Sequence, residues 1–154
     1  NLPKEKKMIA PAYQDISTNQ IPTVKKNGGS VRVISGAYEE TIGPGKSHTP
    51  VIILDIHLKL KTKISIDIPN GWNSFAYVYE GAVTMSKDLS KGNLAIFTQE
   101  GKILIQSKDI DSKIYLAAGE PLNEPVARGG PFVMNTRGEI LQAFADYESG
   151  KIGL

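Results

Sequence analysis

Hydrophobic and polar residues alternate with a period of two along much of the chain after Ser30. Such alternation is typical of β-strands that have one buried face and one solvent-facing face. The clearest examples cover residues 31–33, 54–60 and 64–68, where Leu60 and Ile68 end the last two runs. Further strands are expected over residues 75–79, 82–85, 94–98, 102–106 and 113–118, with turns at Gly81, Gly92-Asn93, Gly101 and Gly119. About seven or eight short strands at this spacing predict an all-β sandwich or barrel.

The first 30 residues have a different character. They are polar and are interrupted by Pro3, Pro11, Pro22 and the pair Gly28-Gly29, which predicts an irregular arm with at most one short strand. We therefore expect an arm or linker over residues 1–30 and one β domain over residues 31–154. Because the chain starts with Asn1-Leu2-Pro3 and without an initiator Met, we also expect it to begin inside a longer protein.

One helix is predicted near the end of the chain, over residues 136–147. Thr136 and Glu139 are spaced as a capping box, in which a hydroxyl and a carboxylate satisfy free amide donors at a helix start. Gly150 is a natural stop. The side chains on one helical face are expected to form a buried stripe: Ile140, Leu141, Phe144 and Tyr147.

Composition and charge exclude several classes of function. The formal charge of +2 comes from 18 basic and 16 acidic residues that are scattered along the chain, so no direct nucleic-acid partner is expected. There is no Cys, which excludes disulfides, thiolate zinc sites and a Cys nucleophile. No apolar run approaches the roughly 18 residues that span a bilayer, so no membrane partner is expected. These features fit a cytoplasmic location, or a nuclear one if the parent is eukaryotic.

Only two histidines are present, His48 and His57, and they do not form a His-x-His pair. An iron or manganese centre needs three or four nitrogen and oxygen ligands that converge on one point. His57 stands among the polar positions of its strand, beside Asp55 and Lys59, so a solvated face explains it without a metal. His48 lies in a Gly- and Pro-rich stretch that predicts a loop. We expect no catalytic, cofactor-binding or metal-ligating residue in this chain.

Three other features allow a functional and a structural interpretation. Arg128-Gly129-Gly130-Pro131 could form an anion-binding nest, although a tight turn before the helix is the commoner structure. Trp72 could form the floor of a ligand cavity, but it is expected in the core. Glu120, Asn123 and Glu124 form a polar cluster between prolines that is expected to hydrogen-bond loop backbone.

Two segments carry a resemblance to a known family. Residues 119–125 (GEPLNEP), followed by residues 130–137 (GPFVMNTR) and the predicted helix, resemble the carboxy-terminal signature of the pirin family. Residues 69–81 (PNGWNSFAYVYEG) and the arm, with Tyr13-Gln14-Asp15-Ile16, are similar to the second cupin of that family. The resemblance covers nearly the whole chain. It implies a jelly-roll cupin fold with one short C-terminal helix.

The pirin resemblance also implies a bicupin in which the amino-terminal barrel binds iron, or another divalent metal, through three histidines and a glutamate. The second barrel, to which this chain corresponds, is metal-free in that family. Superposing the turn at Glu80-Gly81 on the metal-bearing barrel brings the His-x-His ligand positions to about Asp67 and Pro69. Proline cannot ligate a metal, and one carboxylate is too few ligands.

The activities attributed to the family fall into different classes. Some bacterial members resemble quercetin 2,3-dioxygenases, animal members resemble iron-responsive transcription coregulators, and other bacterial members are linked to binding of metabolic enzymes. For this chain alone, the resemblance implies a structural or interaction role without chemistry. The expected partners are the N-terminal cupin of the same protein and, in the regulator alternative, a transcription factor or metabolic enzyme.

Overall fold

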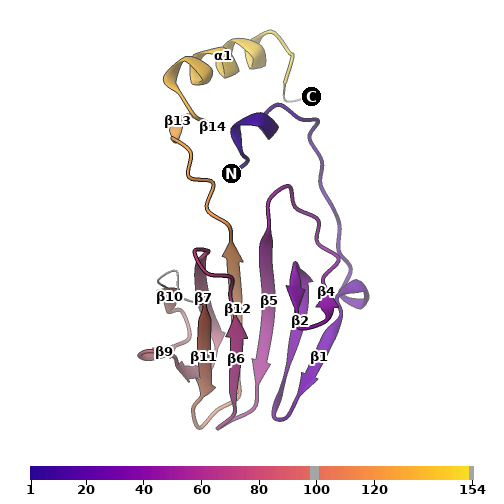
Figure 1. Cartoon of the computed structure of the whole chain (residues 1–154), viewed down its shortest axis with the longest axis vertical. Helices are drawn as coiled ribbons and strands as arrows, with labels where there is room; N and C mark the ends of the chain where they lie inside the picture. The colour runs from indigo at the N-terminus through magenta and orange to yellow at the C-terminus, as the bar shows by residue number, and fades with distance from the viewer. Residues whose placement is uncertain (98–100, 153–154) are drawn as a thin grey trace. The chain divides into compact units, whose positions relative to one another are not determined.

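The structure is a computed structural model that describes residues 1–97 and 101–152. These residues form two compact units, which Figure 1 shows in colours that follow the chain. The larger unit spans Tyr13–Pro121, and the smaller unit combines Asn1–Ala12 with Leu122–Leu154. The arm expected over residues 1–30 is therefore divided between the two units. Its first part belongs with the C-terminal segment, and its last part enters a β-sheet of the larger unit.

Two antiparallel sheets build the larger unit. The first sheet has six strands, which lie in the order β1 (Thr23–Lys26), β2 (Gly29–Ser35), β5 (Val51–Leu58), β12 (Ser112–Gly119), β7 (Asn73–Glu80) and β10 (Leu94–Phe97). The second sheet has four strands, which lie in the order β6 (Lys63–Asp67), β11 (Lys102–Ser107), β8 (Ala82–Thr84) and β9 (Asp88–Ser90). A short ribbon of β3 (Ala37–Tyr38) and β4 (Thr41–Ile42) and the 3-10 turn η2 (Thr18–Gln20) complete the larger unit.

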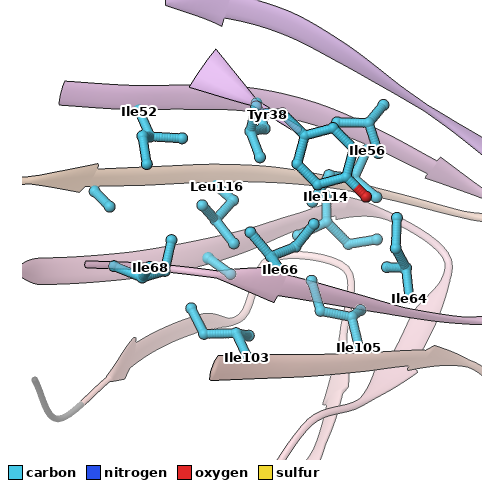
Figure 2. Packing of buried hydrophobic residues seen from close by; sticks show 14 of the residues in the cluster. Tyr38, Ile52, Ile56, Ile64, Ile66, Ile68, Ile103, Ile105, Ile114 and Leu116 are labelled. Atoms are coloured by element: carbon cyan, nitrogen blue, oxygen red, sulfur yellow. The ribbon is translucent and has the colours of Figure 1, made fainter. Parts of the chain in front are cut away.

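A hydrophobic core fills the space between these two sheets. Every second residue of the central strands is buried, as in β11, where Ile103 and Ile105 point inward between exposed neighbours. Figure 2 shows Ile66 and Ile105 of the second sheet directed toward Leu116 and Ile114 of the first. Burial of these side chains is the main favourable contribution to folding. The predicted all-β sandwich with one C-terminal helix is thus confirmed.

The alternating pattern located most strands of the sandwich correctly. Strands β2, β5, β6, β7, β8, β10, β11 and β12 each overlap a predicted stretch. Thr98, the predicted end of the strand at 94–98, lies outside the described residues. Short strands that carry little alternation were not predicted, namely β3, β4, β9, β13 (Ala127–Gly129) and β14 (Phe132–Met134).

Two details of the strand prediction are wrong. Leu60 was expected inside a strand, but β5 ends at Leu58 and Leu60 is exposed. The chain turns there, with Lys61 at a positive φ of 56° and the Thr62 amide bonded to the Lys59 carbonyl. Gly119 was expected in a turn, yet it is the last residue of β12 and is paired with both Val51 and Asn73.

The smaller unit contains the 3-10 turn η1 (Lys4–Lys6), the hairpin β13–β14 and helix α1 (Arg137–Glu148). The predicted capping box is confirmed: the Glu139 amide donates to the Thr136 hydroxyl at 3.2 Å, and the Thr136 amide donates to the Glu139 carboxylate at 2.9 Å. Gly150 follows the helix with a positive φ of 72°, as expected for a stop.

The predicted buried stripe of α1 is wrong in part. Ile140 is buried, but the other buried helix residue is Ala143. Leu141 is 64% exposed, Phe144 is 37% exposed and Tyr147 is also exposed. The unit is small, so its hairpin covers a narrow face of the helix, and the Phe132 ring meets the Phe144 ring edge-on at 5.1 Å. The remaining apolar side chains of the stripe face solvent.

Hydrogen bonds join the two ends of the chain within the smaller unit. The Lys4 amide donates to both carboxylate oxygens of Glu124, at 3.2 and 2.9 Å, and Asn135 Nδ2 donates to Glu124 at 2.8 Å. Lys4 Nζ lies 3.3 Å from Glu139. The expectation that Glu120, Asn123 and Glu124 hydrogen-bond loop backbone is met in part: Glu124 accepts from the Lys4 amide, which belongs to the 3-10 turn η1. These contacts give the signature residues after Gly119 a structural role.

Candidate functional site

The two histidines lie at opposite ends of β5, so the structure does not bring them together. His48 is in the loop before this strand, whereas His57 is its penultimate residue. Over residues 1–97 and 101–152, no group of three or more His, Cys, Asp or Glu residues could hold a metal ion. The described residues therefore do not provide a set of side chains that could bind a metal ion.

A cavity of about 980 Å³, here called the mouth cavity, opens between the loop before β5 and the segment that follows β6. Asp67 and Pro69, the two positions that the pirin resemblance aligned with metal ligands, both line this cavity. The Asp67 carboxylate is largely exposed and pairs with Lys102 at 3.4 Å. His48 lines the cavity too. The site where the resemblance implies a metal in a related barrel thus contains a proline and a solvated ion pair.

Trp72 was expected either in the core or in the floor of a ligand cavity, and it contributes to both a core and a cavity. Its side chain is half-buried and packs against the hydrophobic core of the sandwich, as expected. It also lines the mouth cavity. The tryptophan is therefore a core residue whose exposed part forms an aromatic wall.

Arg128-Gly129-Gly130-Pro131 forms the turn of the β13–β14 hairpin. Gly130, at a positive φ of 52°, and Pro131 connect the two strands, and Arg128 pairs with Val133 across them. The expected tight turn is confirmed.

A polar cluster on the outer face of the six-stranded sheet surrounds Asp55. Asp55 and His57 alternate with the inward-facing Leu54, Ile56 and Leu58, yet the Asp55 side chain is only 13% exposed. Arg32, on the neighbouring strand β2, donates from Nη1 to Asp55 Oδ2 at 3.0 Å. The Tyr79 hydroxyl donates to Asp55 Oδ1 at 2.5 Å. We call Arg32, Asp55, His57 and Tyr79 the Asp55 cluster.

His57 completes the Asp55 cluster. Its Nε2 lies 3.1 Å from both Asp55 Oδ1 and the Tyr79 hydroxyl. The carboxylate thus receives donors on both oxygens, and the positive charge of Arg32 compensates its own charge. The members of the cluster satisfy one another, so it stabilises the sheet. The sequence interpretation of a solvated strand face is correct only in part: the His57 side chain is partly exposed, but the neighbouring Asp55 is buried. The partners of His57 also come from strands that the chain order does not reveal.

The Asp55 cluster predicts a pH effect on stability. Burial, reinforced by the hydrogen bond and charge of Asp55, raises the pKa of Tyr79 well above its ordinary value of 10.0. Because the unfolded chain ionises first, the stabilisation is complete below about pH 10 and is lost as the pH rises further. Between about pH 10 and 12, the free energy of unfolding should therefore fall less steeply in Tyr79→Phe than in wild type. The pKa of Tyr38 and of Tyr115 is raised by burial as well, so part of the slope remains.

Urea unfolding at a series of pH values measures this effect. The unfolding midpoints of wild type and Tyr79→Phe should converge as the pH rises. Parallel curves over that range would show that the Tyr79 hydroxyl ionises equally in both states.

The six-stranded and four-stranded sheets enclosing one core, with a mouth cavity at one end of β5, define a cupin sandwich. Its likeness to solved structures is high: a crystal structure of quercetin 2,3-dioxygenase from Acinetobacter baumannii superposes with a TM-score of 0.90 at 34% identity, over 99% of this chain and 55% of that one. The family model for the pirin C-terminal cupin domain matches residues 53–153. The chain belongs to the pirin family and corresponds to its C-terminal cupin half.

Curated relatives agree with this assignment. The chain is 38% identical to pirin from Mus musculus, over 99% of this chain and 55% of that protein. It is 37% identical to a pirin-like protein from Caulobacter vibrioides, over 98% of this chain and 56% of that protein. The chain thus spans about half the length of the curated relatives it matches. No helix within the described residues is long and apolar enough to cross a membrane.

Proposed function

We propose that this chain is the metal-free structural half of a pirin-like bicupin, and that the chemistry of the parent protein resides in an N-terminal cupin. The observation that supports the proposal is the lining of the mouth cavity, which contains Asp67 and Pro69, the two residues that the pirin resemblance aligns with metal ligands. A metal-dependent dioxygenase needs a metal with several ligands and open positions. The other barrel would supply that site with iron or another divalent metal.

The parent activity that we propose is that of a metal-dependent quercetin 2,3-dioxygenase. Support comes from the Acinetobacter baumannii structure of that name, which this chain resembles over 55% of that chain's length. The role of the present chain is then to bind and position the N-terminal cupin. It contributes no ligand to the metal.

The surface that we propose for the N-terminal cupin is the exposed apolar side of α1, formed by Leu141, Phe144 and Tyr147. Apolar side chains gathered on one small helix indicate a covered surface in the parent protein. A second apolar surface lies on the larger unit, where Phe75, Tyr77, Leu94 and Ile96 project from the outer face of β7 and β10. This second surface serves as the alternative in the test.

The test mixes this chain with a separately purified N-terminal cupin of a pirin-like parent. Calorimetry should detect association, and quercetin absorbance should fall in the presence of the N-terminal cupin but not with this chain alone. Leu141→Asp should weaken association at least about tenfold, whereas the matched variant Ile96→Asp, at an even more exposed position, should not. The reverse pattern would move the interface to the sheet. Quercetin turnover by this chain alone, or no association at all, would contradict the proposal.

An iron-dependent, redox-sensing regulator is the second candidate for the parent. The exposed apolar side of α1 favours it, since such a surface also suits a transcription factor or a metabolic enzyme as partner. The same experiment separates the two candidates. Association of the halves with iron bound but without quercetin turnover would favour the regulator.

A further inference from the structure

A second cavity lies entirely within the smaller unit and is separate from the mouth cavity. Its volume is about 510 Å³, within the range of about 300–1,000 Å³ that is usual for small-molecule sites. Both ends of the chain line it: residues of the first segment face residues of the β13–β14 hairpin and of the segment after α1. We call it the end cavity.

The walls of the end cavity suit a flat apolar molecule. Phe132 is one wall, and its ring is supported edge-on by Phe144 at 5.1 Å and by Tyr147 at 6.1 Å. Met8 and Met134 line the cavity as well. Methionine side chains adapt to the shape of an apolar ligand and make favourable contacts with aromatic rings. An aromatic ligand would thus meet one fixed wall and two adaptable ones.

The charges around the end cavity favour an anion. Its charged lining side chains within the described chain are two cations, Lys7 and Lys151. The Lys7 ammonium is held by Asn1 Oδ1 at 2.7 Å and by the Leu2 carbonyl at 2.8 Å, and both of these acceptors are uncharged. Lys151 instead pairs with Asp146 at 3.3 Å. Of these two side chains, Lys7 is therefore the one whose charge has no charged partner. This points to a ligand that carries a single negative charge.

We propose that the end cavity binds a small aromatic monocarboxylate, with its ring against Phe132 and its carboxylate accepting from Lys7 Nζ. This site contains none of the residues of the mouth cavity. Its lining does not include Leu141, Phe144 or Tyr147 of the surface proposed for the N-terminal cupin, although the last two support the Phe132 ring. A neutral ligand of the same shape binds less well because it gains no charge-assisted hydrogen bond from the ammonium group.

The chain offers an internal reporter for this site. It has three methionines, of which Met8 and Met134 line the end cavity, while Met85 packs against the core of the larger unit. The probe is 2-naphthoate, titrated into the full 154-residue chain labelled with ¹³C at its methionine methyl groups. Signals are assigned with Met8→Leu and Met134→Leu. Naphthoate should shift the Met8 and Met134 signals and leave the Met85 signal in place.

Charge is tested in two ways. The neutral analogue 2-naphthamide should bind about tenfold more weakly than naphthoate, and Lys7→Gln should weaken naphthoate binding by a similar factor. Lys87→Gln, which removes an exposed charge from the larger unit, is the matched control and should change nothing. If Lys7→Gln does not fold, the comparison of naphthoate with naphthamide decides alone. Equal binding of the two probes, a shift of Met85 together with the others, or no shift at about 1 mM naphthoate would overturn the proposal.

Discussion

Gly81→Ala is expected to lower the free energy of unfolding by about 3 kcal/mol or more. Gly81 joins β7 to β8 at a positive φ of 77°, a conformation that costs a residue with a Cβ about 1–2 kcal/mol. A Cβ at this position would also lie 2.3 Å from the Asp111 carbonyl oxygen and 2.5 Å from Ser112 Oγ. The backbone of the loop before β12 would have to shift, and the first two residues of the pairing between β12 and β7 would shift with it.

Gly71→Ala is the matched control for this prediction. Gly71 has a similar positive φ of 83°, but a Cβ there would meet nothing within 4 Å. The cost of Gly71→Ala should therefore be the conformational cost alone, about 1–2 kcal/mol. Urea unfolding of both variants measures the difference. Equal losses at the two positions would show that the contact with Asp111 relaxes without cost.

Asp55→Ala is expected to cost about 2–4 kcal/mol, because it leaves Arg32, His57 and Tyr79 without their shared acceptor. This loss of unfolding free energy is smaller than for a fully buried ion pair because the Arg32 side chain remains partly exposed. Asp67→Ala is the control: its carboxylate is 77% exposed, so its pair with Lys102 should contribute less than about 0.5 kcal/mol.

A double variant separates the charge from the rest of the Asp55 cluster. Arg32→Ala combined with Asp55→Ala should cost less than the sum of the two single losses, because neither charge is then left without its partner. Unfolding free energies for the four proteins complete the cycle. Strictly additive losses would mean that the 3.0 Å contact between the two side chains contributes nothing.

Local patterns were sufficient to predict the sandwich and one helix end. The alternation in β6 and β11 follows directly from burial of one face, and the Thr136 capping box depends on residues three positions apart. Short strands were missed because the prediction depends on a repeating pattern within one stretch of sequence. Strand β13 has three residues, too few for any period to emerge, and it is defined by its pairing with β14.

The candidate sites depended on contacts that no local pattern contains. The residues of the Asp55 cluster come from three strands, β2, β5 and β7. Tyr79 lies where the pairing between β7 and β12 shifts its register. The contact of Lys4 with Glu124 spans 120 positions of the chain. Helix α1 shows the opposite error: its periodicity predicted one buried stripe, but the small unit covers only the side with Ile140 and Ala143. The expectation that two separated histidines do not make a metal centre rests on composition and stays a prediction.

The metal content of the purified chain tests the central claim most directly. After dialysis without chelator, elemental analysis should find no stoichiometric iron, manganese, nickel or copper in this chain, whereas an intact pirin-like parent should hold about one metal ion in its N-terminal cupin. About one tightly bound metal per chain here, lost on His48→Ala or His57→Ala, would contradict the account.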